Sequence, residues 1–258
     1  MLRIAEAAAD RAFGFLATAR PPAGPAGWSA KGARDFVTHV DRTAEMLIRE
    51  MLLAAEPSGR VLGEELSPDE PDVRRGLVWV VDPLDGTTNF LHGYPQYAIS
   101  IAAAVDGELL AGVVRHGARG DRYTAARGAG AFLDGTRLRV STIDDPAFAL
   151  IGTGFPFSDL SRWEAYQRQF RAVAGAAAGI RRAGAAALDL ADVSAGRFEG
   201  FWELRLSPWD IAAGIVLIRE AGGVITDFDG TPLSGLERCG VVAGNPAMHA
   251  WLLRTLAG

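Results

Sequence analysis

The sequence contains a single cysteine, a single lysine and no run of apolar residues long enough to span a membrane. Because one cysteine excludes an internal disulfide framework and is typical of a reducing compartment, we expect a cytoplasmic protein without a membrane partner. Glu6 and Asp10 interrupt the apolar N-terminal stretch, which argues against a secretory signal. The net charge is −5 and no basic stripe is present, so nucleic acid is not the expected partner.

The 258 residues, of which 49% are hydrophobic and 22% charged, are enough for one large domain or two closely associated ones. Periodicity predicts helices over 2–19, 44–52, 163–178, 185–195, 211–218 and 247–256. It predicts strands over 61–63, 78–81, 97–105, 109–114, 124–138, 198–204, 224–227 and 241–243, with a hairpin turn at Asp106-Gly107. This order indicates layered α and β elements. We expect an N-terminal α+β part over residues 1–145 and a C-terminal α/β part over 146–258 that form one compact unit.

The most informative segment is the run from Val78 to Phe90. It begins as an apolar, β-branched stretch typical of a buried strand, and the turn signal Asp82-Pro83 predicts the end of that strand. Gly86-Thr87-Thr88 then indicates the entry to a helix, whose backbone N–H groups can hold an anion. Because the run contains no Lys or Arg, a bound phosphate would need a cation to screen it from Asp82 and Asp85. Mg²⁺ with oxygen ligands meets that requirement.

Four segments in order resemble the signatures of the inositol monophosphatase family, which comprises Mg²⁺-dependent, Li⁺-sensitive phosphatases. They are Asp35-Phe36-Val37-Thr38 with Asp41, Gly63-Glu64-Glu65, the run from Asp82 to Phe90, and Trp209 to Gly214 continuing through Gly223. The resemblance covers nearly all of the chain. It implies an αβαβα sandwich, a homodimer, and hydrolysis of a small phosphorylated polyol or sugar.

The resemblance also implies the metal ligands, which would hold two Mg²⁺ ions and a third, weaker one. These ligands are the side chains of Glu64, Asp82, Asp85 and Asp210 and the backbone carbonyl of Leu84. Asp82 and Asp210 are 128 positions apart, so the active site would lie between the two halves of the chain. The alternative for each acid is structural, because Asp commonly caps turns and helix starts.

Further residues are implied around the reacting water. By resemblance, Thr87 and Glu64 orient and deprotonate the attacking water, and Asp41 orients water near the third metal. The alternative for Asp41 is a capping box with Thr38. Glu65 and the lone lysine, Lys31, would support the metal site. The alternative for Glu65 is a solvated acidic loop, and the alternative for Lys31 is a lysine without a specific role.

On the substrate side, the resemblance implies contacts from Asp85, Gly86, Thr87, Ala186, Glu203 and Asp210. Ala185 lacks the hydroxyl that the family carries in the preceding position, which leaves one polar contact in doubt. The expected reaction is hydrolysis of myo-inositol monophosphate to inositol and phosphate by a metal-activated water. Histidinol phosphate, fructose 1,6-bisphosphate and 3′-phosphonucleotides are alternative substrates, and a partner role in a transcription complex is an alternative of another class.

Overall fold

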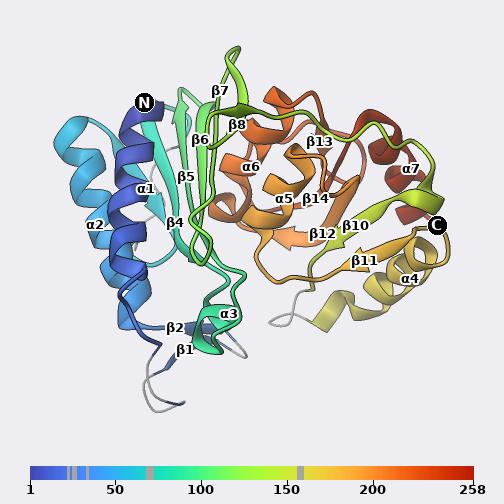
Figure 1. Cartoon of the computed structure of the whole chain (residues 1–258), viewed down its shortest axis with the longest axis horizontal. Helices are drawn as coiled ribbons and strands as arrows, with labels where there is room; N and C mark the ends of the chain where they lie inside the picture. Colours follow the sequence, from blue (N-terminus) through green and yellow to red (C-terminus); the bar gives the residue numbers. More distant parts are fainter. Residues whose placement is uncertain (22–23, 25–27, 33–34, 68–72, 156–159) are drawn as a thin grey trace.

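The computed structural model describes residues 1–21, 24, 28–32, 35–67, 73–155 and 160–258, and the side chains of 29–32 and 35–37 lie outside that description. Figure 1 shows five layers, with helices on the outside and in the middle and one sheet in each of the two layers between them. The predicted αβαβα sandwich is confirmed. The outer helices are α1 (Leu2–Leu16) and α2 (His39–Ala55) on one side and α4 (Trp163–Ala174) and α7 (Pro246–Leu256) on the other, with α5 (Ala186–Ser194) and α6 (Pro208–Glu220) in the middle.

The first sheet is built from the N-terminal half and has the strand order β3-β4-β5-β6-β7-β8-β9. Its strands are β3 (Arg60–Gly63), β4 (Leu77–Asp85), β5 (Ala98–Val105), β6 (Glu108–His116), β7 (Arg122–Ala126), β8 (Gly130–Leu133) and β9 (Thr136–Arg137). Neighbouring strands are antiparallel except for β3 and β4. The predicted hairpin between β5 and β6 is confirmed, because Asp106 and Gly107 both adopt positive φ, at 51° and 84°.

The second sheet has the order β11-β10-β12-β14-β13. Its strands are β10 (Leu150–Thr153), β11 (Gly179–Arg181), β12 (Gly200–Leu206), β13 (Val224–Thr226) and β14 (Cys239–Gly244). The sequence did not predict β10 or β11. The helix predicted to reach Ala178 ends at Ala174, because Gly175 forms its C-terminal cap, and the chain then enters β11.

Three apolar clusters hold the five layers together. One packs α1 and α2 on the outer face of the first sheet, one packs α5 and α6 between the sheets, and one packs α4 and α7 on the outer face of the second sheet. The two sheets are drawn from opposite sides of the boundary at 145/146, although the division into two parts stays a prediction. No helix in the described ranges has both the length and the apolar character that a membrane span requires.

Two smaller elements bear on the site. A short antiparallel pair, β1 (Ser29–Gly32) and β2 (Asp35–Val37), precedes α2. Helix α3 (Thr87–Leu91) follows β4 directly and begins at Gly86, which adopts a left-handed conformation with φ 86°. The helix entry predicted at Gly86-Thr87-Thr88 is therefore confirmed.

Candidate active site

The strand that carries Asp82 and Asp85 does not end at Asp82-Pro83, as the sequence predicted, but continues to Asp85. Asp82 pairs with Ser100 of β5 and Asp85 pairs with Ala98, so three steps on β4 match two steps on β5. Such a β-bulge accommodates Pro83, which has no N–H to donate. Residues three apart in a regular strand point to opposite faces, whereas Ser100 and Ala98 share one face. The bulge therefore turns both carboxylates toward the same face.

Each of these carboxylates is held by backbone N–H groups. Asp82 is 1% exposed, and its Oδ1 accepts a hydrogen bond from the N–H of Leu84 at 2.9 Å. The Oδ2 of Asp85 accepts from the N–H of Ala187 at 2.8 Å, in the first turn of α5. Because the N-cap residue Ala185 has no side-chain hydrogen bond, Asp85 provides the cap for this helix from the opposite half of the chain.

Asp210 reaches the same place from the start of α6. Its Oδ2 accepts the N–H of Ser207 at 2.7 Å in a capping box, so the structural role that the sequence left open is present. The hydroxyl of Ser100 donates to the carbonyl of Trp209 at 3.1 Å, which links β5 to the start of α6. Gly112 of β6 lets α6 lie close, because a Cβ at this position would meet the carbonyl oxygen of Ala213 at 2.7 Å.

The acidic side chains gathered here raise one another's pKa. Burial raises the pKa of Asp82 well above its ordinary value, and the charges of Glu64, Asp85 and Asp210 raise it further. Burial also raises the pKa of Asp85 to about 7, an effect that the N–H of Ala187 opposes and Glu64 reinforces. The pKa of Asp210 is raised by burial, by Glu64 and by Asp85. The charge of Asp210, from the second half of the chain, thus acts on Asp82 in the first half.

The loop after β3 places Glu64 and Glu65. Both follow Gly63 directly, and the N–H of Glu64 continues the pairing with β4 by donating to the carbonyl of Val81 at 3.2 Å. The N–H of Glu65 donates to Oε2 of Glu45 at 2.7 Å, and the N–H of Leu66 donates to Oε1 at 3.2 Å.

Glu45 of α2 is a residue of this region that the sequence analysis missed. It is 0% exposed, and burial raises its pKa while the N–H of Glu65 and the charge of Arg49 lower it. A signal was present, because an acid at position 45 lies on the apolar stripe formed by Ala44, Ile48 and Leu52. An acid on a buried helix face needs partners, and the loop at 65–66 supplies them.

Thr87 and Asp41 form a hydrogen-bonded pair. The Thr87 hydroxyl lies 2.8 Å from Oδ1 of Asp41, and the carbonyl of Leu84 is a second acceptor for it at 3.0 Å. The other oxygen of Asp41 accepts the backbone N–H and the hydroxyl of Thr38, at 2.9 and 2.6 Å. The capping box predicted for Asp41 is therefore present. It uses only Oδ2 of Asp41, so Oδ1 can accept the hydrogen bond from Thr87. The resemblance implies that Thr87 acts with Glu64, and this stays a prediction beside the observed hydrogen bond to Asp41.

Gly86 and Asn89 bring the loop before α3 against the loop before α5. A Cβ at position 86 would meet the carbonyl oxygen of Gln96 at 2.8 Å and the Cβ of Ala185 at 3.3 Å. The Asn89 amide donates to the carbonyls of Gln96 and Ala183, at 2.6 and 2.9 Å. These contacts fix Gly86 and Thr87 beside the start of α5, where Ala186 lies.

A cavity of about 140 Å³ opens at this junction. It is lined by Asp85, Arg182, Ala186, Asp189, Glu203 and Asp210, among others. Burial raises the pKa of Glu203 to about 8, and the charge of Arg182 opposes that shift. The sequence analysis assigned neither Arg182 nor Asp189 to the site.

The donor set fits a hard divalent cation, because carboxylate oxygens and a backbone carbonyl are the ligands that Mg²⁺ accepts and the buried acids repel one another. In the described part of the chain, no three His, Cys, Asp or Glu side chains are close enough together to hold a metal ion by themselves. The acids thus surround the site without closing into a cage. Lys31 lies in β1, and its side chain is outside the described part.

Comparisons with known proteins place the whole chain in one family. The sequence model of the inositol monophosphatase family matches residues 1–257. The chain is 48% identical over 229 residues to Nus factor SuhB of Pseudomonas aeruginosa, covering 88% of this chain and 84% of that protein. It is 49% identical over 217 residues to inositol-1-monophosphatase of Rhizobium meliloti, covering 84% and 81%. The structure of extragenic suppressor protein suhB from Bartonella henselae matches with a TM-score of 0.89 and 39% identity, covering 98% of this chain and 97% of that one.

Proposed function

Because this chain belongs to the inositol monophosphatase family, we propose that it is a Mg²⁺-dependent phosphatase that hydrolyses a small phosphate monoester, with myo-inositol monophosphate as the first candidate. The observation that carries the proposal is the convergence of acids from both halves of the chain at one cavity. Asp85 and Asp210 line that cavity, and Asp82 and Glu64 interact with both.

The metal ions would be two Mg²⁺ and a third that binds more weakly. Their ligands would be the side chains of Glu64, Asp82, Asp85 and Asp210 and the carbonyl of Leu84. When bound, Mg²⁺ neutralises phosphate charge and makes a coordinated water more acidic. The side chain of Glu65 and Lys31 would support this region, and the N–H groups of Gly86 and Thr87 would receive phosphate oxygens.

The Asp41–Thr87 pair is suited to handle the proton of the attacking water. A hydroxyl that donates to a carboxylate keeps lone pairs with which to accept a hydrogen from water. Thr87 can therefore orient a water and pass its proton toward Asp41, a general-base arrangement. Glu64 would also orient this water, as the family resemblance implies.

The test is phosphate release from a panel of myo-inositol 1-phosphate, histidinol phosphate, fructose 1,6-bisphosphate and 3′-phosphoadenosine 5′-phosphate. Each is assayed with Mg²⁺, with Mg²⁺ plus Li⁺, and with EDTA. We expect Mg²⁺-dependent, Li⁺-inhibited turnover concentrated on one substrate. Equal rates with EDTA and with Mg²⁺ would contradict the proposal.

A second candidate function is a partner role in a transcription complex, which is supported by the relatives named Nus factor SuhB. Recovery of RNA polymerase with the tagged protein from an extract would support it, provided that Asp210→Asn does not reduce that recovery. Loss of recovery in a folded Asp210→Asn variant would count against a role independent of the active site.

The homodimer implied by the resemblance is also a proposal. Large apolar side chains stay exposed on and just before α4, among them Leu160, Trp163 and Phe170, and this face is where we would look first for a contact. Sedimentation of the wild type and of Trp163→Asp would test it, since the charged variant should sediment as a smaller species.

A further inference from the structure

The cavity at the start of α5 contains an acid whose role the motifs do not explain. Asp189 is 1% exposed and lines the cavity together with Asp85, Ala186 and Glu203. Within the described part of the chain, its Oδ1 has no hydrogen-bond partner. A buried carboxylate oxygen without a partner is costly, so its retention calls for a ligand.

The position of Asp189 on α5 accounts for its orientation. Ala186 and Asp189 are three residues apart and therefore lie on one face of the helix, and both line the cavity. The first turn of α5 is fixed because Asp85 caps the N–H of Ala187. Asp189 lies between this cap and the next contact of the helix with the first sheet.

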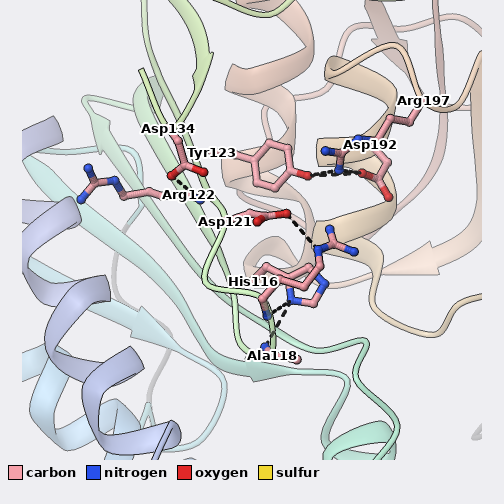
Figure 2. A network of polar contacts seen from close by, with 9 residues as sticks. His116, Ala118, Asp121, Arg122, Tyr123, Asp134, Asp192 and Arg197 are labelled. Carbon is pink, nitrogen blue, oxygen red and sulfur yellow. Dashed lines mark hydrogen bonds and ion pairs between the residues drawn. The ribbon is translucent and has the colours of Figure 1, made fainter. Parts of the chain in front are cut away.

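That next contact is shown in Figure 2. Asp192 of α5 receives a hydrogen bond from the hydroxyl of Tyr123 on β7 at 3.3 Å and pairs with Arg197 at 2.8 Å. With α5 held on both sides of Asp189, the backbone of this residue is fixed beside the cavity that its side chain lines.

The surroundings of Asp189 select the chemistry of the ligand. The cavity beside Asp189 is lined by three more carboxyl groups, those of Asp85, Glu203 and Asp210, and by the guanidinium of Arg182. An anionic group would be repelled by so many acids, whereas an alcohol offers O–H donors that carboxylates accept. We propose that Asp189 is a specificity-determining residue that, with Glu203, accepts hydrogen bonds from hydroxyl groups of a polyhydroxylated leaving group. This inference rests on the proposed function, to which it adds a substrate contact.

The experiment compares two phosphate esters in the wild type and in Asp189→Ala. One is myo-inositol 1-phosphate, whose alcohol carries further hydroxyls, and the other is phenyl phosphate, whose alcohol carries none. We expect kcat/KM to fall about tenfold or more on the inositol ester, since a hydrogen bond is lost and the substrate hydroxyl is left without a partner in a buried site. On phenyl phosphate we expect a change of less than about threefold. If Asp189→Ala does not fold, Asp189→Asn replaces it, because asparagine keeps the shape of the side chain. This variant should lose more kcat/KM on the inositol ester than on phenyl phosphate, by a smaller factor than expected for alanine.

The matched control is Asp192→Asn, one turn further along α5, where the carboxylate bonds to Tyr123 and Arg197 and does not line the cavity. It should affect both esters equally. Equal losses on both esters in Asp189→Ala would overturn the proposal and indicate a structural role. Equal losses with a raised Mg²⁺ requirement would also overturn it, and would indicate a cation site.

Failure of the proposed function is recognised separately, as absence of turnover of both esters by the wild type. In that case binding of free myo-inositol, measured by saturation-transfer NMR, decides the matter. Binding by the wild type that is lost in Asp189→Ala supports the hydroxyl contact. Equal binding by the two proteins, or none by the wild type, overturns it.

Discussion

Replacing Glu45 by Gln tests how the loop that carries Glu64 is held in place. The carboxylate accepts two backbone N–H groups, from Glu65 at 2.7 Å and from Leu66 at 3.2 Å. An amide offers one acceptor oxygen and presents its NH₂ group to the other N–H. One N–H of this half-buried loop then loses its partner, at a cost of about 1–3 kcal/mol, which is partly offset because the variant no longer buries a charge.

We expect this cost to appear locally, because α2 keeps its apolar face against the sheet. Opening of the loop should raise the exchange rates of the Glu65 and Leu66 amide hydrogens, and should raise the Mg²⁺ concentration for half-maximal phosphate release by about 5- to 100-fold. The assays are hydrogen exchange by NMR and a Mg²⁺ titration of turnover. Glu50→Gln makes the same chemical change on the exposed face of α2 and should alter neither. Unchanged exchange and an unchanged Mg²⁺ titration in Glu45→Gln would refute the reasoning.

Two further variants, both in β6, test the packing of α6 and the pH dependence of stability. Gly112→Ala should destabilise the protein by about 1–3 kcal/mol in urea unfolding and reduce turnover besides, because the new Cβ pushes on Ala213 in the helix that carries Asp210; wild-type stability and turnover would contradict this. Burial and the charge of Arg119 lower the pKa of His116 from 6.5 to about 4, and the charge of Asp121 opposes this shift. The folded protein therefore binds a proton here less readily than the unfolded chain does. The contribution of the neutral ring to stability is fully present above pH 6.5 and is lost as the pH falls toward 4. At one pKa unit per about 1.4 kcal/mol, the loss approaches about 3 kcal/mol. His116→Asn keeps an acceptor for the N–H groups of Ala118 and Arg119, so its unfolding free energy should vary less between pH 7 and 4 than that of the wild type, and parallel curves would count against the assignment.

The sequence predicted what depends on local chemistry. The hairpin at Asp106-Gly107, the capping box of Thr38 with Asp41, and the helix entry after Gly86 are each set by residues within a few positions of one another. Turn and cap residues act through their own backbone, so their signals survive without knowledge of the fold.

The sequence could not predict what depends on register. Asp82 and Asp85, three residues apart, would point to opposite faces of a regular strand, and only the bulge against Ser100 and Ala98 puts them on one face. The strand β10 was missed because Gly152 interrupts its apolar residues, and β11 because its three residues follow an Ala-rich segment that favours a helix.

Pairings between distant residues were equally hidden. Asp41 and Thr87 were both singled out by their motifs, yet their hydrogen bond joins residues 46 positions apart. Asp189 carries no motif at all, and its free oxygen becomes notable only once α5 is seen to be fixed against the cavity.

We propose that Asp210 completes, with Asp82 and Asp85, a Mg²⁺-dependent phosphatase site shared by the two halves of the chain. The most direct test is phosphate release from myo-inositol 1-phosphate by the wild type and by Asp210→Asn, each with Mg²⁺ and with EDTA, beside their thermal unfolding midpoints. The asparagine oxygen can still accept the N–H of Ser207, so the cap of α6 should survive. We expect Mg²⁺-dependent turnover in the wild type and a loss of several orders of magnitude in a folded variant. Turnover near the wild-type rate in Asp210→Asn, or undiminished turnover with EDTA, would contradict it.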